Sequence, residues 1–218
     1  MSEILPLPEP ASTAEAGDVA AARKRRKPGE RRIQILQALA AMLEQPGAER
    51  ITTAALAARL SVSEAALYRH FASKAQMFEA LIDFIESSVF GLINQIGERE
   101  PAGRARAARI VAMVLQFGEK NPGMARVMVG DALVFEHQRL QQRMNQFFDK
   151  LDAALRQSLR DGALADAAEP ATLTPDADAR VRASVLTAFV AGRLQRFARS
   201  GFRRAPSEQL GACIARML

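Results

Sequence analysis

The chain has 218 residues, of which 49% are hydrophobic and 25% are charged, and its formal net charge is +6. This length suits a small module and one larger helical body, while the single cysteine excludes an internal disulfide and a multi-cysteine metal site. No apolar run approaches the ~18 residues that a membrane-spanning helix needs. Tyrosine occurs once and tryptophan is absent, so helix formers dominate and we expect an all-α protein.

Residues 1–29 show no helical pattern and are predicted to form a disordered tail that ends in a basic run. Residues 1–22 carry four acidic side chains and no basic one, whereas residues 23–78 carry eleven basic and four acidic ones. The run at 23–32, RKRRKPGERR, suits either a solvated entry to the first helix or an arm that follows DNA phosphates. The basic excess in this part of the chain indicates a polyanionic partner. The N-terminus lacks a secretory pattern, which predicts a cytoplasmic protein.

The segment that follows is typical of a helix-turn-helix. A first helix is predicted from about Glu30 to Glu44, because apolar residues recur there at spacings of three and four. The sequence ITTAALAARLSVSEAALYRHF then predicts two short helices at 54–60 and 64–70, joined by a tight turn at Ser61-Val62. Residues 30–75 are therefore interpreted as a three-helix DNA-binding domain, although a generic amphipathic hairpin would share this spacing.

The polar residues of this domain predict its DNA contacts. Thr52 or Thr53 and then Ser63 are helix caps, and the small Ala65 lets the second helix approach base edges. Lys74, behind the predicted cap Ser73, makes the start of the next helix a natural phosphate site. The candidate DNA-binding residues, expected on one exposed face, are Thr52, Thr53, Ser63, Ala65, Tyr68, Arg69, His70 and Lys74.

The remaining chain, residues 76–218, is predicted to be a helical body for dimerisation and partner binding. The expected helices cover about 74–96, 102–119, 132–160 and 175–199, and a short one follows Pro206. The helices at 132–160 and 175–199 have apolar faces broader than one packing partner requires, which predicts a homodimer with a four-helix interface. Five large apolar residues suit either plain core or a ligand pocket: Met113, Phe117, Met124, Phe147 and Phe189.

Catalytic chemistry finds little support in the sequence. His70 and His137 are the only histidines, and no set of histidine, cysteine and carboxylate residues has metal-ligand spacing. No glycine-rich phosphate loop is present, and the acidic pair Glu98 and Glu100 suits a solvated helix end. We therefore expect a protein that is not an enzyme, with no catalytic residue, no metal site and no cofactor.

Residues 30–85 resemble the DNA-binding domain of the TetR family of regulators. The recognition helix of that family carries Leu-Tyr-(Arg/His)-His-Phe followed by Ser-Lys, and the stretch Leu67–Phe71 with Ser73-Lys74 matches it. Ser61 stands where the family usually has a turn glycine, and Ala72 replaces a common proline. The segments LIDFIESS, FGEKNPG and FEHQRLQQRMNQFF extend the resemblance to about residue 160, towards the nucleoid occlusion branch of the family.

This resemblance implies a homodimer that binds chromosomal palindromes in double-stranded DNA and is associated with the nucleoid. Its DNA-bound form would capture the C-terminal tail of the division protein FtsZ, with no membrane and no small-molecule ligand involved. The tail would lie between the helices at 74–96 and 102–119, with Phe84, Met113, Lys120 and Asn121 as candidate contacts. Phe84 equally suits a packing position against the first helix. The alternative function is a ligand-responsive TetR-type repressor.

Overall fold

Apolar residues spaced three and four apart recur along the chain, and the computed structural model, which describes residues 29–45, 50–163 and 174–218, is accordingly helical. Every regular element within these residues is a helix, which confirms the all-α prediction. The predicted tail at 1–28 lies outside the described residues. In chain order the elements are α1 (Glu30–Leu43), α2 (Thr53–Arg59), α3 (Glu64–Tyr68), α4 (Lys74–Arg99), α5 (Gly103–Lys120), α6 (Pro122–Met128), the short 3-10 helix η1 (Asp131–Leu133), α7 (Gln138–Ala163), α8 (Pro175–Arg199) and α9 (Leu210–Met217).

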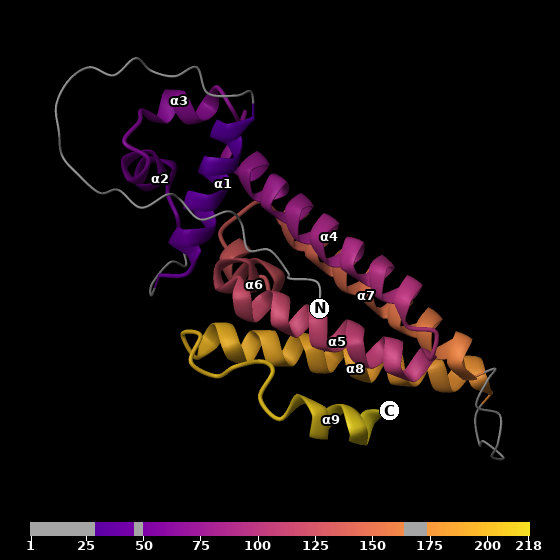
Figure 1. Ribbon diagram of the computed structural model, residues 1–218. Coiled ribbons are helices and arrows are strands. Elements are labelled where there is room, and N and C mark those ends of the chain that lie inside the picture. Colours follow the sequence, from indigo (N-terminus) through magenta and orange to yellow (C-terminus); the bar gives the residue numbers. More distant parts are fainter. Residues whose placement is uncertain (1–28, 46–49, 164–173) are drawn as a thin grey trace, which may run out of the picture.

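Helices α1, α2 and α3 gather into a small module at one end of a longer helical body (Figure 1). The module has an apolar core that is continuous with that of the body, and Leu56, Leu67 and Phe71 contribute to it. Leu39 of α1 is buried in the same core. Helix α4 begins in this module and continues into the body, so the predicted domain boundary after residue 75 falls within α4.

The body consists of long helices that run back and forth between the module and the far end (Figure 1). The 26 residues of α4 span about 39 Å and bury a stripe of apolar residues: Met77, Phe78, Leu81, Ile82, Ile85, Val89 and Ile93. Helix α5 returns towards the module, α7 leads away from it and α8 comes back beside α7. Among the residues that the structure describes, none of the helices combines the length and the apolar character that crossing a membrane requires.

Two sequence predictions about the body were wrong in detail. The single helix expected at 132–160 begins only at Gln138, because residues 131–133 belong to the separate 3-10 helix η1 and residues 134–137 are not helical. The expected helices also lacked α6, which begins at Pro122. Proline suits that position, since its missing N–H has no partner in the first turn of a helix.

The apolar residues of α8 separate into two faces. Leu186, Val190 and Leu194 are buried inside the protomer, whereas Val181 and Val185 are 53% and 48% exposed. The outward valines therefore leave an apolar strip on α8 that the described residues of a single chain do not cover.

The module is docked on the body through a close contact between α1 and α6. A Cβ atom on Gly123 would lie 2.2 Å from the main-chain oxygen of Ala40 and 3.2 Å from Cβ of Leu43. Nearby, Nη1 of Arg126 donates a hydrogen bond of 2.9 Å to the carbonyl oxygen of Gln45. Because only glycine permits this approach, residue 123 determines how closely the module sits against the body.

We expect Gly123→Ala to destabilise the protein by about 1–3 kcal/mol, because main-chain atoms of α1 would have to move away from the new methyl group. The measurement is urea unfolding of the purified chain. Gly91→Ala on α4 is the matched control: no atom lies within 4 Å of a Cβ built there, and alanine should stabilise the helix by up to about 1 kcal/mol. Equal stability of Gly123→Ala and the wild type would contradict the close contact.

Candidate nucleic-acid interface

Three side-chain caps hold the helices of the module in place. Oγ1 of Thr52 accepts a hydrogen bond of 3.1 Å from the amide of Ala55, and this selects Thr52 rather than Thr53 as the cap of α2. Oγ of Ser63 caps α3, and Oγ of Ser73 caps α4, each at 3.2 Å from an amide nitrogen. Each cap satisfies an amide that has no partner within its helix.

The turn between α2 and α3 has a left-handed backbone at Ser61, the position where the TetR family usually has a glycine. Ser61 has a φ of 53°, and Val62 is half-buried beneath the crossing helices. A residue with a Cβ atom costs on the order of 1 kcal/mol more than glycine in this conformation. The chain therefore accepts some backbone strain at the turn that orients α3.

Most of the candidate DNA-binding residues lie on the exposed surface of the module. Thr52, Ser63, Ala65, Tyr68 and Arg69 are exposed, and Tyr68 is the last residue of α3, which ends two residues before the predicted His70. Ser63 and the small Ala65 leave the start of α3 sterically open. Tyr68 and Arg69 supply a phenol hydroxyl and a guanidinium at its end. Such a surface can place donors against both base edges and phosphates.

The other candidates are less free than the sequence suggested. The hydroxyl of Thr53 donates a hydrogen bond to the carboxylate of Glu64, and His70 is half-buried. Lys74 lies at the start of α4 as predicted, but its ammonium group forms an ion pair with the carboxylate of Glu136. No sequence pattern indicated this pair, because the two residues are 62 positions apart.

Arg32 is a further cation at this end of the module, and the sequence reading had included it only as part of the basic run. Its guanidinium lies 4.1 Å from the ring centroid of Phe71 and donates a hydrogen bond to the carbonyl oxygen of His70. Stacking on an aromatic ring holds the guanidinium in one place. Arg32 therefore adds positive charge beside the end of α3.

The four candidate partner-binding residues differ in what they present to a partner. Phe84 on α4 is half-buried and Lys120 at the end of α5 is exposed. Met113 and Asn121 are buried, and Nδ2 of Asn121 donates a hydrogen bond of 2.8 Å to the carbonyl oxygen of Phe117. The structure thus leaves Phe84 and Lys120 as accessible groups and gives the Asn121 amide an internal partner.

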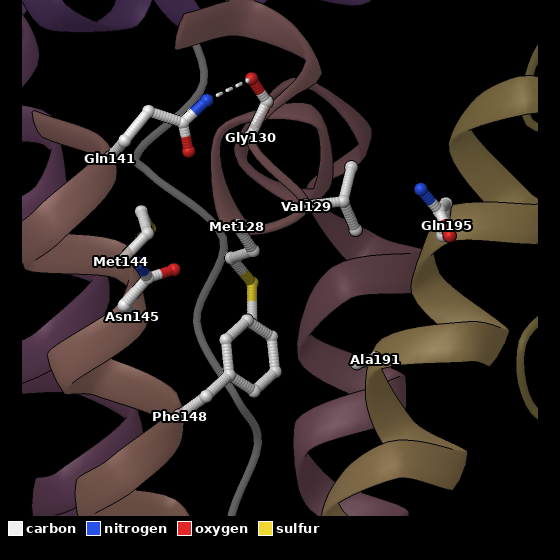
Figure 2. A pocket seen from close by; sticks show the side chains of 9 residues that line it. All are labelled: Met128, Val129, Gly130, Gln141, Met144, Asn145, Phe148, Ala191 and Gln195. Atoms are coloured by element: carbon white, nitrogen blue, oxygen red, sulfur yellow. Dashed lines mark hydrogen bonds between the residues drawn. The ribbon is translucent and has the colours of Figure 1, made fainter. Parts of the chain in front are cut away.

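The large apolar residues of the body are mainly core. Met113, Phe117, Met124 and Phe147 are all buried, and Phe189 is half-buried. A separate open pocket of about 160 Å³ lies between α7 and α8, and none of these five residues lines it. Figure 2 shows Met128 and Phe148 extending towards each other in that pocket, beside the Gln141 amide that donates to the Gly130 carbonyl.

Comparisons with known proteins cover both parts of the chain. Residues 35–81 match the model of the tetR family of bacterial regulatory proteins, and residues 103–215 match that of the SlmA-like, tetracyclin repressor-like C-terminal domain. The nucleoid occlusion factor SlmA of Citrobacter koseri is 49% identical over 183 residues, and that of Idiomarina loihiensis is 46% identical over 182 residues. Each alignment covers 84% of this chain and 90% of the relative.

Solved structures of lower identity share the fold. The transcriptional regulator FadR from Bacillus subtilis, solved in complex with stearoyl-CoA, superposes with a TM-score of 0.65 at 13% identity, over 85% of this chain and 96% of FadR. The MbdR regulator from Azoarcus sp. CIB superposes with a TM-score of 0.66 at 16% identity, over 84% of this chain and 95% of MbdR. At these identities the likeness concerns the fold alone and confirms its TetR-like architecture.

We expect Arg69→Ala to change which DNA sequences the protein selects, because a guanidinium at the end of α3 can donate two hydrogen bonds to one guanine. Loss of such a contact costs about 1–3 kcal/mol at the affected base pair. The measurement is selection from a random duplex pool, followed by anisotropy titration. Arg204→Ala, an equal charge change at an exposed residue outside the module and outside α7 and α8, is the control and should leave the selected sequence unaltered. An unaltered sequence with Arg69→Ala would remove Arg69 from base contact.

Proposed function

The chain belongs to the TetR-like family of SlmA nucleoid occlusion factors, and we propose that its DNA-bound homodimer captures the C-terminal tail of FtsZ and inhibits Z-ring assembly over the nucleoid. Membership makes it a DNA-binding regulator rather than an enzyme. The observation that carries the proposal is the identity of 49% over 183 residues, which extends from the helix-turn-helix through most of the body. A partner site outside the DNA-binding module would lie in that shared body.

The contacts proposed for DNA are those on the exposed side of α2, α3 and the start of α4. The caps Thr52 and Ser63 are exposed, so the N-termini of α2 and α3, with their backbone N–H groups, lie at the surface. Tyr68 and Arg69 supply side-chain donors. His70 and Lys74 are assigned to phosphates, which fix the register of a protein on DNA without reading its sequence. The basic excess of residues 23–78 adds a general attraction to DNA.

The proposed dimer uses α7 and α8. On α8 the exposed valines Val181 and Val185 continue into Ala188, which is also exposed, and Gly192, which has no atom within 4 Å of a built Cβ. Small residues allow a helix of a second copy to approach closely. Two α7–α8 pairs related by a two-fold axis would form a four-helix interface and bury this strip.

We expect the double variant Val181→Asp, Val185→Asp to be monomeric in sedimentation velocity, because two carboxylates would be buried in the interface. Its affinity for a palindromic site should fall by more than about tenfold, since the second half-site then binds independently. Val134→Asp is the matched control for the sedimentation measurement, because Val134 is an exposed valine outside α8. A wild-type chain that sediments as a monomer at micromolar concentration would contradict the dimer.

The proposed FtsZ site is the surface between α4 and α5 that presents Phe84 and Lys120. A half-buried ring can anchor an extended peptide, and the exposed ammonium group of Lys120 can pair with its carboxylates. Met113 and Asn121 would shape the floor of this surface from below, since both are buried. The packed interior around Phe117 and Phe147 supports a protein-binding role over a ligand-responsive one.

We expect Phe84→Ala, Lys120→Ala to weaken binding of an FtsZ tail peptide by roughly tenfold or more, which corresponds to about 1.4 kcal/mol. The measurement is calorimetric titration of the peptide into the DNA-bound protein. Phe135→Ala, Arg204→Ala removes an exposed ring and an exposed cation elsewhere and is the control. Equal affinity of variant and wild type would move the site elsewhere. Absence of binding to the wild type would instead favour the ligand-responsive repressor.

A further inference from the structure

One ion pair joins the proposed DNA surface to the body. The ammonium group of Lys74 pairs with the carboxylate of Glu136, which lies between η1 and α7. The Lys74 side chain is 26% exposed, and that of Glu136 only 9%. The lysine assigned to a DNA phosphate is therefore already neutralised by a well-shielded carboxylate of the same chain.

The Lys74–Glu136 pair has the opposite charge arrangement to the neighbouring ion pairs between α4 and α7. Farther from the module, α4 supplies the acids Glu79, Asp83 and Glu86, and α7 supplies the cations Arg139 and Arg143. Those pairs involve none of the proposed DNA contacts, so they hold α4 against α7 whether or not DNA is bound. Among the α4–α7 ion pairs of the described residues, the Lys74–Glu136 pair differs because DNA can compete for its cation.

A DNA phosphate and the Glu136 carboxylate bind the same ammonium group of Lys74. Both are anions that take a short, charge-assisted hydrogen bond from an ammonium group. If both remained beside Lys74, two negative charges would face each other in a partly shielded site, where repulsion is stronger than in bulk water. Binding of DNA at Lys74 therefore favours departure of the Glu136 carboxylate.

We propose that Glu136 is an internal competitor for the DNA phosphate and thereby sets the affinity of this protein for DNA. On binding, a phosphate replaces the carboxylate at Lys74, and the segment 134–137 loses its tie to α4. Val134 and Phe135 in that segment are 64% and 66% exposed, so little apolar packing of their side chains holds it in place. The inference rests on the proposed function, which assigns Lys74 to a phosphate.

The test is Glu136→Gln, which keeps the shape of the side chain and removes its charge. We expect DNA affinity to rise by about three- to tenfold, while the slope of log K against log salt stays nearly the same, because Lys74 meets a phosphate in both complexes. Glu79→Gln is the charge-matched control on the same pair of helices, and its effect should stay within twofold. An unchanged or lower affinity for Glu136→Gln would overturn the proposal.

A double-mutant cycle separates competition from general electrostatics. In a Lys74→Ala background, Glu136→Gln should no longer raise affinity, whereas an equal gain in both backgrounds would overturn the proposal as a mere charge effect. If Lys74→Ala leaves the affinity of the otherwise wild-type protein unchanged, the phosphate assignment of the proposed function fails. If it weakens binding and Glu136→Gln still brings no gain, only the competition fails.

Hydrogen exchange of the wild-type chain supplies a test that needs no variant. Amides of residues 134–137 should exchange faster in the DNA complex than in the free protein, because their segment has lost the ion pair to α4. Unchanged or slower exchange on DNA binding would overturn the release of this segment. Amides in the middle of α5, which contact neither Lys74 nor Glu136, are the internal reference.

Discussion

The orientation of the recognition helix depends on a steric constraint at Gly123. The absent side chain of this residue lets α6 approach the main chain of α1 at Ala40, and α1 in turn packs with α2 and α3 around one small core. Close-packed interfaces resist deformation, so when the body shifts, the module shifts with it. The position of α3 relative to the proposed dimer strip on α8 follows from this contact and from the start of α4.

Electrostatics divides α4 into two parts with different roles. In the body half of α4, carboxylates pair with arginines of α7, and these ion pairs hold the two helices together. At its first residue, the charge pattern is inverted, and Lys74 meets an acid from the segment before α7. One helix thus combines a permanent attachment to the body with an exchangeable one at the proposed DNA surface. Helix α4 thus provides a physical route by which DNA binding can be coupled to the binding of a partner on the body.

The body has a filled interior and uncovered surfaces, and this balance fits the family to which the chain belongs. Four of the five residues considered as pocket lining are buried in the core: Met113, Phe117, Met124 and Phe147. By contrast, the outward strip of α8 and the half-buried Phe84 are apolar groups at the surface. This packing supports our proposal that the protein binds macromolecules at its surface.

The sequence alone determined what depends on neighbours within four residues. The caps Ser63 and Ser73 follow from local hydrogen bonds, so their motifs were readable, and the pattern at Thr52-Thr53 narrowed the cap of α2 to two residues. The left-handed turn at Ser61 is also a matter of local backbone sterics, and the turn glycine of the family pointed to it. Only the tertiary structure decided which face of α8 is buried, that Asn121 bonds internally, and that Lys74 pairs with Glu136. Hydropathy marks a residue as apolar without naming the surface that covers it, and an ion pair across 62 residues exists only once α4 and the start of α7 have been brought together.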